Sequence, residues 1–559
     1  MPYLEGEKLI VTEQERIDLY RNKGLWGELR LHDLLYRTAE KHPDRLALVD
    51  PANKLALVGS NPQRLRYSEV VNQVDRLAAV LLTFGFGKDD ILLVQMPNVF
   101  ELVLLYMAAS KLGVIISPVP VQYKEHELSE VLQVLEPKAI VSVATLKGVG
   151  FLDHQVAAVN QIERILPHRP NIFLFGEGEG CINLCEEMEN CSELTNLEHY
   201  CDSVSISSND VLTICWTSGT EGTAKGIPRT HNHWLSVGMA TYEGNRIEEG
   251  ESLLNPFPFI NMASIGGLFL SWLYCGGKLV LHHPLDLPIF LQQIVDEKIS
   301  YTLVPPALLN TLLKDEGLLA TCDLSSIRAI GSGSSPLDEW MVAGFQDRFG
   351  IEVVNHFGSN EGVSLLCGPN ETSDPFKRAR LFPRNVSILE TRLVNPETGV
   401  PIHEPGFQGE LQIKGPGVFD GYYKDPRKTL SSFTDDNYFR TGDLFEIDSE
   451  DPNFYRFVGR CKDLIIRGGV NIAPAELDSL LCSHPDIVEA AVAGYQCDVM
   501  GERVAAFAVC KPSCSLELSD VVNFLKEQKI ASFKLPEKLV LIESIPRNPL
   551  GKVLRNQLN

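Results

Sequence analysis

The stretch VLTICWTSGTEGTAKG, residues 211–226, joins a continuous apolar run to a polar loop rich in small residues. The run has the length and composition of a buried β-strand, so it would deliver the loop at its end. Exposed backbone N–H groups, hydroxyls and one ammonium group can together wrap phosphate oxygens. A polar turn between two elements is the alternative for the loop taken alone. The candidate phosphate ligands are Thr217, Ser218, Gly219, Thr220, Gly222 and Lys225.

The surrounding chain predicts an α/β fold. Residues 78–120, 298–315 and 327–358 each alternate short apolar strands with helical segments, punctuated by Gly and Pro. This pattern indicates parallel sheets with helices on both faces. From about residue 385 the sequence becomes rich in strands and turns, which is typical of a small barrel or antiparallel sheet. We expect two α/β subdomains and a small β-barrel-like subdomain in residues 1–459, and a small mobile α+β domain in residues 460–559.

Composition limits the classes of partner. The chain has 559 residues, too many for one core, and a net charge of -23, which argues against nucleic acid or an anionic membrane surface. The N-terminus lacks the pattern of a signal peptide, and no apolar stretch approaches the roughly 20 residues of a membrane span, so a cytoplasmic protein without integral membrane association is expected. The cysteines at 181, 185, 191 and 201 lack zinc-knuckle spacing and are expected to be solvent-facing or half-buried thiols.

Four further motifs follow the loop in order. They are NHFGSNEG (355–362), YFRTGDL (438–444), GRCKDLIIRGGVNIAPAELD (459–478) and PRNPLGKVLR (546–555). With the loop, they resemble the adenylate-forming superfamily of acyl-CoA synthetases, luciferases and peptide-synthetase adenylation domains, along essentially the whole chain. The chain is most similar in appearance to aryl-, alicyclic- or medium-chain acyl-CoA ligases. A Walker-type phosphotransferase is excluded, because Gly226 stands where Ser or Thr would bind magnesium.

The resemblance implies two half-reactions. A carboxylate attacks the α-phosphorus of ATP to give acyl-AMP and pyrophosphate, and the thiol of coenzyme A then displaces AMP. ATP, Mg²⁺ and coenzyme A are therefore the expected cofactor and cosubstrates, and a carboxylic acid is the expected partner. The loop at 217–226 is expected to bind the β- and γ-phosphates. A separate acyl carrier protein as acceptor, and a homodimer, stay open.

The resemblance also implies roles for individual residues. Glu361 matches the acid that holds magnesium, and Lys225 supplies charge at the phosphates. Alone, Phe357 would be read as core packing and Glu361 as a helix N-terminal acid. The nucleotide positions are Gly333, Ser334, Ser335, Phe357, Gly358 and Ser359 around adenine, Asp443 at the ribose hydroxyls, and Arg460 at the ribose or phosphate.

The C-terminal motifs carry the remaining roles. Lys462 occupies the hinge position, around which the small domain is expected to rotate between the half-reactions. Lys552 matches the catalytic lysine that reaches the acyl carboxylate and the α-phosphate. Gly468 and Gly469 are expected to line the tunnel for pantetheine, where side chains would block it; a simple turn is their alternative.

The acid itself is not readable from the sequence. His231 and Asn232 fall where aryl-acid activators contact the substrate, with a helix N-cap as the alternative for Asn232. Phe259 and Asn261 lie in the corresponding acyl-binding motif, and Asn261 stands near the position of a common histidine, so no catalytic histidine is assigned. The neighbouring apolar residues predict a mostly apolar pocket. Glu221 departs from the usual Ser or Thr and places a carboxylate beside the triphosphate.

Three classes of function remain to be compared. The first is a stand-alone acyl-CoA ligase. The second makes the same adenylate but loads the phosphopantetheine thiol of a carrier protein, which would have to be a separate chain because no carrier domain follows Lys552. The third is a non-catalytic nucleotide- or acyl-binding relative. The presence of Lys225, Glu361, Asp443 and Lys552 argues against the third class.

Overall fold

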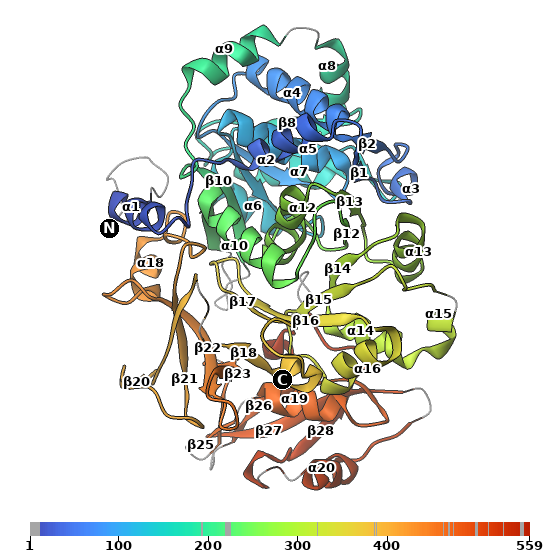
Figure 1. Ribbon diagram of the computed structural model, residues 1–559, viewed down its shortest axis with the longest axis vertical. Helices are drawn as coiled ribbons and strands as arrows, with labels where there is room; N and C mark the ends of the chain where they lie inside the picture. The colour runs from blue at the N-terminus through green and yellow to red at the C-terminus, as the bar shows by residue number, and fades with distance from the viewer. Residues whose placement is uncertain are drawn as a thin grey trace.

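The computed structural model describes residues 12–191, 194–217, 225–320, 322–384, 386, 388–461, 463–467, 470–472, 474–497, 501–511, 514–528, 530, 532–547 and 553–558. Within these residues the chain forms four sheets of five or more strands, with helices packed against them. The carboxyl-terminal part, drawn in orange to red, forms one end of the molecule (Figure 1).

The first large sheet is parallel except at its two edges. Residues Tyr301, Ala329 and Glu352 begin three adjacent parallel strands, whose carboxyl ends therefore meet at one edge of the sheet. The strands in spatial order are β17 (Ser364–Cys367), β16 (Glu352–Gly358), β15 (Ala329–Gly333), β14 (Tyr301–Val304), β12 (Ser252–Asn255), β13 (Lys278–Leu281), β1 (Leu46–Val49) and β2 (Arg64–Arg66).

The second large sheet contains the strand predicted from VLTICW. That strand runs parallel to β4 and antiparallel to the strand that follows the loop. The order is β11 (Lys225–Thr230), β10 (Val211–Thr217), β4 (Ile115–Pro118), β3 (Ile91–Gln95), β5 (Ala139–Val143), β8 (Asn171–Phe175) and β9 (Ile182–Asn183). The expected buried strand before the loop is confirmed.

Helices cover both faces of these sheets, as predicted. The largest core lies between the two sheets and contains residues from both, together with helices α2 (Leu31–Lys41), α4 (Tyr67–Thr83), α5 (Phe100–Leu112), α10 (His231–Gly244) and α12 (Leu270–Cys275). Leu92 and Val94 of β3 point into this core, whereas Leu93 points to the opposite side. Helices α6 (Glu125–Leu135) and α7 (Leu152–Ile162) cover that side.

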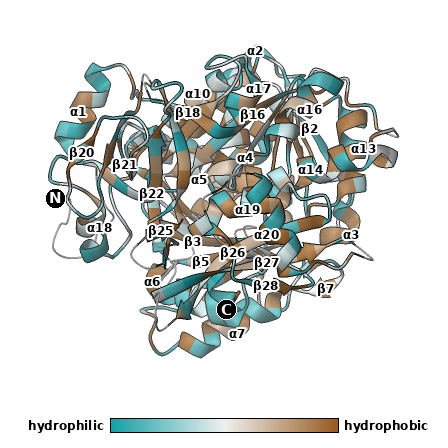
Figure 2. Ribbon diagram, turned by 90° about the horizontal axis from the view of Figure 1, so that it is seen from below, coloured by the Kyte–Doolittle hydropathy of each residue, from teal (hydrophilic) through white to brown (hydrophobic). Residues whose placement is uncertain are grey.

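The outer face of the first sheet has its own core. It is formed with helices α13 (Leu287–Glu297), α14 (Pro306–Lys314), α15 (Glu316–Ala320) and α16 (Glu339–Phe349). Helix α1 (Gln14–Asn22) lies near the start of the chain. Helices α8 (Leu184–Asn190) and α9 (Thr195–Ser203) each contribute a leucine to the central core. Peripheral helices such as α1, α13 and α14 show hydrophilic and hydrophobic residues on different sides (Figure 2).

The part of the sequence that is rich in strands and turns, from about residue 385, forms most of a six-stranded antiparallel sheet with a separate core. Its order is β18 (Leu381–Pro383), β23 (Phe454–Arg460), β22 (Phe439–Ile447), β21 (Gln408–Lys414), β19 (Glu390–Val394) and β20 (Pro401–Ile402). Helices α17 (Pro375–Arg380) and α18 (Pro426–Ser432) flank it in sequence. The prediction of a small antiparallel subdomain after two α/β subdomains is confirmed.

The final part mixes helices and strands, also as predicted. Between Arg460 and Ile465 the chain passes from the six-stranded sheet into the last one. That sheet contains β25 (Val470–Ile472), β24 (Ile465–Arg467), β27 (Gly501–Cys510), β26 (Ile487–Cys497) and β28 (Lys538–Leu541), with helices α19 (Pro474–Cys482) and α20 (Leu518–Glu527) packed on it. The domain boundary at residue 460 stays a prediction.

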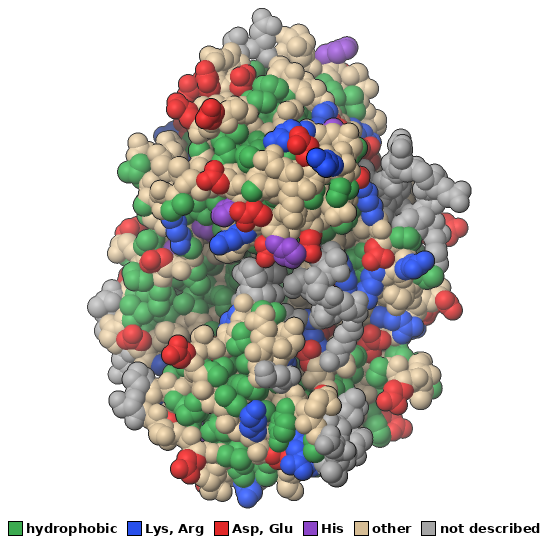
Figure 3. Space-filling view, turned by 180° about the vertical axis from the view of Figure 1, so that it is seen from behind, with side chains coloured by type: hydrophobic (Ala, Val, Ile, Leu, Met, Phe, Trp, Pro, Cys, Tyr) green, Lys and Arg blue, Asp and Glu red, His purple; other side chains and the backbone are tan. Residues whose placement is uncertain are grey.

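The surface and the thiols agree with the sequence analysis. On the face opposite to that of Figure 1, acidic and basic side chains are interspersed (Figure 3). Cys185 and Cys201 are exposed, and Cys181 and Cys191 are half-buried. No helix within the described ranges combines the length and the apolar character needed to cross a membrane.

Candidate functional site

The polar loop that follows β10 is anchored at both ends by strand pairing. Thr217, the last residue of β10, lies opposite Lys225, the first residue of β11. The antiparallel register therefore fixes where the loop leaves and re-enters the sheet. Ser218, Gly219, Thr220, Glu221 and Gly222 lie outside the described residues, so their predicted phosphate contacts and the orientation of Glu221 stay predictions.

Lys225 and Glu361, the two predicted catalytic residues of the large domain, meet at a third side chain. The Nζ atom of Lys225 lies 5.7 Å from the centroid of the Tyr422 ring. The hydroxyl group of Tyr422 donates a hydrogen bond to Oε1 of Glu361 at 3.1 Å. Burial and the Glu361 carboxylate raise the pKa of Tyr422, so the phenol stays a hydrogen-bond donor at neutral pH. An ammonium group and a carboxylate thus flank one buried phenol.

Sequence reasoning missed Tyr422. Its signal is a pair of tyrosines, Tyr422 and Tyr423, after Gly421 in a turn, and such a pair is more typical of packing than of a site. Tyr422 is 5% exposed and packs against Phe419, with ring centroids 4.9 Å apart. The contact with Glu361 joins residues far apart in the chain, so only the fold reveals it.

The predicted adenine-side residues lie at the carboxyl ends of β15 and β16. Gly333 pairs with His356 in the parallel register, and an added Cβ at Gly333 would lie 2.1 Å from the carbonyl oxygen of His356. Only glycine fits this approach. Ser334, with φ +73°, and exposed Ser335 continue from it. Crevices at the carboxyl ends of parallel strands are where open α/β sheets bind ligands.

Phe357 was expected either to pack in a core or to stack on adenine, and its surroundings are compatible with both. Its ring is half-buried, and ring centroids of Phe382, Phe445 and Phe457 lie 5.8, 5.0 and 5.5 Å away. The ring is therefore rigidly held by the core of the six-stranded sheet, with part of its surface left accessible at the strand end. A fixed aromatic edge of this kind suits a planar base.

The segment after Phe357 turns sharply back. Gly358 is exposed, and the backbone N–H of Ser359 donates to the carbonyl of Val363 at 3.1 Å. The Oγ atom of Ser359 is buried and has no hydrogen-bond partner among the residues that the structure describes. At Gly362, with φ +106°, an added Cβ would lie 2.0 Å from the carbonyl oxygen of Gly417. The loop that carries Glu361 is thus pressed against residues near Tyr422.

The predicted ribose carboxylate lies on a neighbouring strand. Asp443 of β22 is 6% exposed and lies opposite Arg460, the last residue of β23. The Oδ1 atom of Asp443 is 3.3 Å from Nε of Arg460, whose side chain is 39% exposed. Gly442, with φ +71°, accepts a hydrogen bond from the N–H of Cys461 at 2.9 Å. Asp443 and Arg460 are therefore brought together, and their contacts with the nucleotide stay predictions.

Each of the four predicted acid-contacting residues forms a hydrogen bond within the protein, and an acid contact by any of them stays a prediction. Asn232 donates to the carbonyl of Gly27 at 3.2 Å and to Oδ1 of Asn209 at 2.9 Å. His231 is buried, and its Nδ1 accepts from the N–H of Leu31 at 3.3 Å. Both residues thus fix the N-terminal segment. The alternative N-cap role of Asn232 is wrong, because helix α10 begins at His231 and its N-cap is Thr230, which accepts from the N–H of His233.

Phe259 and Asn261 have structural contacts as well. Phe259 is 1% exposed, and its carbonyl accepts from the hydroxyl group of Tyr106 at 2.7 Å. Asn261 caps helix α11 (Met262–Ser264) by accepting from the N–H of Ser264. The structure places Phe259 in the central core and Asn261 at a helix start, so an acid contact by either residue stays a prediction.

Two histidines that are shielded from solvent, His231 and His356, give the stability of the protein a predictable pH dependence. Burial lowers the pKa of His231 and of His356 to about 3, against about 6.5 in an unfolded chain. Between these values the unfolded state binds protons that the folded state does not, so the free energy of unfolding decreases as the pH falls from 6.5. Each histidine contributes up to about 1.4 kcal/mol per pH unit in this window and nothing above it.

Denaturant unfolding between pH 7.5 and 5.0 measures this effect. His356→Gln keeps a donor for Oδ1 of Asn245, which the His356 ring contacts at 3.0 Å, and removes the titrating ring. We expect the free energy of unfolding of the variant to decrease less steeply with falling pH than that of the wild type. Equal slopes would exclude His356 as a source of the acid sensitivity.

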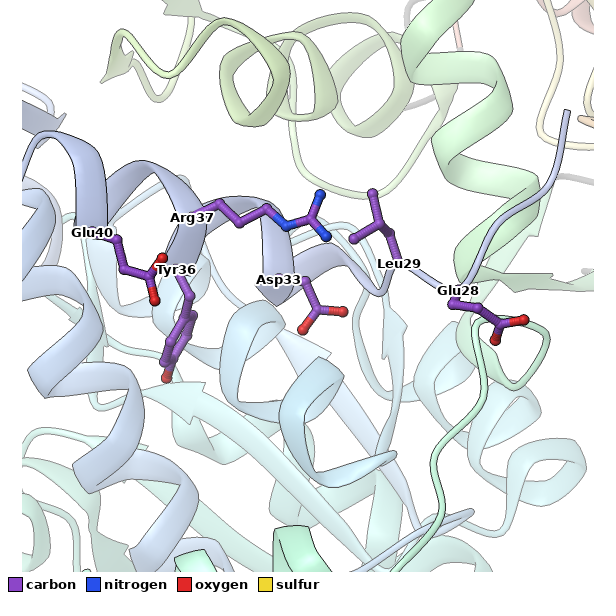
Figure 4. Close-up of a pocket in the computed structure, with 6 residues that line it drawn as sticks. All are labelled: Glu28, Leu29, Asp33, Tyr36, Arg37 and Glu40. Atoms are coloured by element: carbon purple, nitrogen blue, oxygen red, sulfur yellow. The ribbon is translucent and has the colours of Figure 1, made fainter. Parts of the chain in front are cut away.

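A pocket of about 510 Å³ opens at helix α2 and the chain before it (Figure 4). Its lining combines three carboxylates, one guanidinium, one phenol and one leucine. The lining residues are Glu28, Leu29, Asp33, Tyr36, Arg37 and Glu40. None of them belongs to the predicted site, so this pocket is separate from the strand ends described above.

The hinge and C-terminal predictions fall mainly outside the described residues. This holds for Lys462, Gly468, Gly469 and Lys552. Arg555, three residues after Lys552, is described: its guanidinium pairs with Asp478 of α19 and donates to the carbonyl of Val492 at 2.6 Å. Residue 555 is therefore attached to helix α19 and to the last sheet.

Comparison with known proteins places the whole chain in one family. The sequence model described as "AMP-binding enzyme" matches residues 35–423, and the one described as "AMP-binding enzyme C-terminal domain" matches residues 476–552. The solved structure of ATP-bound MatB from Rhodopseudomonas palustris superposes with a TM-score of 0.79 at 25% identity, over 95% of this chain and 98% of that one.

Curated relatives have similar lengths, but their names describe different ligase reactions. A medium-chain fatty-acid–CoA ligase of Escherichia coli is 27% identical over 98% of this chain and 92% of its own. A vibriobactin-specific 2,3-dihydroxybenzoate-AMP ligase of Vibrio cholerae is 28% identical over 96% of this chain and 95% of its own. The relatives thus include both CoA ligases and aryl-AMP ligases.

Proposed function

Because this chain belongs to the AMP-binding enzyme family, we propose that it is an ATP-dependent acid–thiol ligase. It activates an aryl, alicyclic or medium-chain carboxylic acid as acyl-AMP, releases pyrophosphate, and transfers the acyl group to coenzyme A. The observation that carries the proposal is the convergence of Lys225 and Glu361 on Tyr422.

The first half-reaction joins two anions, so catalysis depends on charge neutralisation and positioning. Lys225 supplies a fixed positive charge at the start of β11, beside the phosphate loop. Magnesium prefers oxygen ligands, and the Glu361 carboxylate offers one, together with the hydroxyl of Ser359, which has no partner within the described part of the chain. When bound, the ion neutralises phosphate charge. Tyr422 fixes the Glu361 carboxylate by donating to one of its oxygens.

The nucleotide would lie along the carboxyl ends of β15 and β16. Gly333 permits the close approach of β15 to the backbone of His356, and the neighbouring Phe357 ring is held in place by its aromatic neighbours. Asp443 accepts hydrogen bonds only, which suits two ribose hydroxyls. Arg460 lies against Asp443 and is accessible enough to reach the ribose or a phosphate.

The second half-reaction is assigned to residues 460–559. In this proposal Lys462 is the hinge, Gly468 and Gly469 line the pantetheine path, and Lys552 serves adenylate formation. The passage of the chain from one sheet to another between Arg460 and Ile465 supports a hinge at this place.

A carrier-protein thiol is the second candidate acceptor. The similarity to a 2,3-dihydroxybenzoate-AMP ligase favours this alternative, whereas the similarity to a fatty-acid–CoA ligase favours coenzyme A. Both reactions share the adenylate, so the large-domain residues have the same roles in either case.

A pyrophosphate-release assay with a panel of aryl, alicyclic and C4–C12 acids tests the proposal. We expect release that requires the acid, ATP and Mg²⁺, and thioester formation when coenzyme A is added. Reactions without acid control for ATP hydrolysis. Release without thioester, followed by acylation of a phosphopantetheinylated carrier, would favour the alternative acceptor. No release with any acid would refute the ligase assignment.

A further inference from the structure

A loop of the six-stranded subdomain touches both halves of the proposed phosphate site. This loop, residues 415–423, is called the bridging loop. The backbone N–H of Phe419 donates to the carbonyl of Glu361 at 2.9 Å, and the N–H of Tyr423 donates to the carbonyl of Gly226 at 2.8 Å. Together with the phenol contact described above, these bonds attach the loop to the metal side and to the lysine side of the site.

The outer side of the bridging loop is held by one arginine from the start of the chain. The guanidinium of Arg16, in helix α1, donates to the carbonyls of Gly415 at 3.1 Å and Phe419 at 3.4 Å, and also to the carbonyl of Val418. It forms an ion pair with the carboxylate of Asp420, and both side chains are mostly buried. The planar guanidinium therefore donates hydrogen bonds to three carbonyl oxygens and one carboxylate.

The peptide group between Val418 and Phe419 connects Arg16 to the backbone of Glu361 through two hydrogen bonds. In a trans peptide the C=O and N–H bonds point in opposite directions. The carbonyl of Val418 points to Arg16, and the N–H of Phe419, in the same peptide group, points to the carbonyl of Glu361. Rotation of this peptide would break both hydrogen bonds at once. Arg16 thus orients the donor that holds the backbone of Glu361.

Other contacts fix the same segment. The hydroxyl group of Thr12 donates to Asp420 at 2.6 Å, and the indole N–H of Trp26 donates to the carbonyl of Pro416 at 3.2 Å. The Arg16 guanidinium carbon lies 5.5 Å from the Trp26 ring centroid. All three side chains precede residue 35, where the match to the family model begins.

A second arginine holds the inner side of the loop. Arg229 is completely buried and donates to the carbonyls of Asn360 at 2.7 Å, Gly417 at 2.9 Å and His233 at 3.0 Å. Burial lowers the pKa of Arg229 to about 9, so it remains protonated at neutral pH. Asn360 directly precedes Glu361. The bridging loop is therefore clamped between two guanidinium groups, one from β11 and one from the N-terminal segment.

We propose that Arg16 is a positioning residue for the magnesium site: it holds the bridging loop so that Tyr422 and Phe419 keep Glu361 in place. The inference rests on the proposed function in one respect, namely that Glu361 binds the metal. The N-terminal segment is then a working part of the site, because it acts on Glu361 through the bridging loop.

Arg16→Ala is the first test, with metal affinity as the measured quantity. Mn²⁺ is titrated into protein with ATP and without acid, and free Mn²⁺ is followed by electron paramagnetic resonance. We expect a roughly tenfold weaker apparent Mn²⁺ affinity, the size of effect that follows from losing one or two hydrogen bonds. In the pyrophosphate assay the Mg²⁺ concentration for half-maximal rate should rise by a similar factor.

Two further variants separate positioning from folding. Arg21→Ala is the matched control, since Arg21 lies in the same helix and pairs with Glu28 at the surface. It should leave metal affinity unchanged. Arg16→Lys keeps the charge but cannot collect three carbonyls, so it should weaken the metal while preserving the fold better than alanine does.

A double-mutant cycle with Tyr422→Phe decides whether Arg16 acts through the bridging loop. We expect the double variant Arg16→Ala/Tyr422→Phe to bind Mn²⁺ about as weakly as the weaker single variant. Additive losses, or a lower melting temperature with unchanged metal affinity in Arg16→Ala and Arg16→Lys, would overturn the proposal. A wild type that shows neither ATP-dependent Mn²⁺ binding nor pyrophosphate release would refute the proposed function instead.

Discussion

Lys552→Ala is expected to slow adenylate formation by about two to four orders of magnitude, the cost of removing one strong electrostatic stabiliser. The resemblance places Lys552 between the acyl carboxylate and the α-phosphate, where negative charge is concentrated as the two anions approach. Its interaction strengthens towards the transition state, so the loss should appear mainly in kcat. Acid-dependent pyrophosphate release under saturating ATP measures it.

The same variant should spare the second half-reaction. Thioester formation from chemically supplied acyl-AMP should persist, since the small domain is expected to have turned and carried Lys552 away. Gly469→Trp should do the opposite by obstructing coenzyme A. Lys534→Ala is a matched control, because Lys534 belongs to the same domain and pairs with Glu476. Equal slowing of both half-reactions by Lys552→Ala would exclude a rotating small domain.

Glu361→Gln is expected to lower the rate of pyrophosphate release by about two to three orders of magnitude. The amide oxygen can still accept the hydrogen bond of Tyr422, and the backbone contacts of residue 361 are unchanged. What is lost is the charge that attracts the metal. The variant should therefore fold with nearly wild-type stability while binding Mg²⁺ together with ATP poorly.

Glu371→Gln provides the comparison for this loss. Glu371 is another half-buried carboxylate of the same subdomain, and it accepts from the N–H of Gly368 at 2.7 Å, outside the proposed site. It should retain close to full activity. If Glu361→Gln retains more than about a third of the wild-type rate at low Mg²⁺, Glu361 is not the metal ligand. Melting temperatures of both variants check that the fold is kept.

The parts of the fold that follow from local pattern were predictable. The strand at 211–217, the parallel strands of both α/β sheets and the antiparallel texture after residue 385 all reflect runs of apolar residues between turn signals. The motifs implied separate nucleotide roles for Asp443 and Arg460, and the fold adds that the two residues are paired across neighbouring strands. Hydrophobic periodicity predicts these strands because each strand depends on the residues of a single continuous segment.

Contacts between distant segments were not predictable in the same way. Tyr422 reaches Glu361, and Arg229 reaches Asn360, only because the β-barrel-like subdomain packs on the strand ends. His231 and Asn232 also contact the backbone of the N-terminal segment, which their motif did not predict, and their contact with the acid stays a prediction. A polar residue in a motif indicates that its side chain forms a hydrogen bond, but the sequence does not identify the group at the other end of that bond.

The pairing of Arg16 with Asp420 has a consequence for how sequences of this kind diverge. The two residues are 404 positions apart, yet each neutralises the other in a mostly buried setting. Loss of either one alone leaves an uncompensated charge, so a lineage can change them only nearly together. Relatives without the arginine should therefore also lack the aspartate. The pair is therefore inherited as a unit across 404 positions, and a single crossover between its two members would separate them unless both parents carry the same pair.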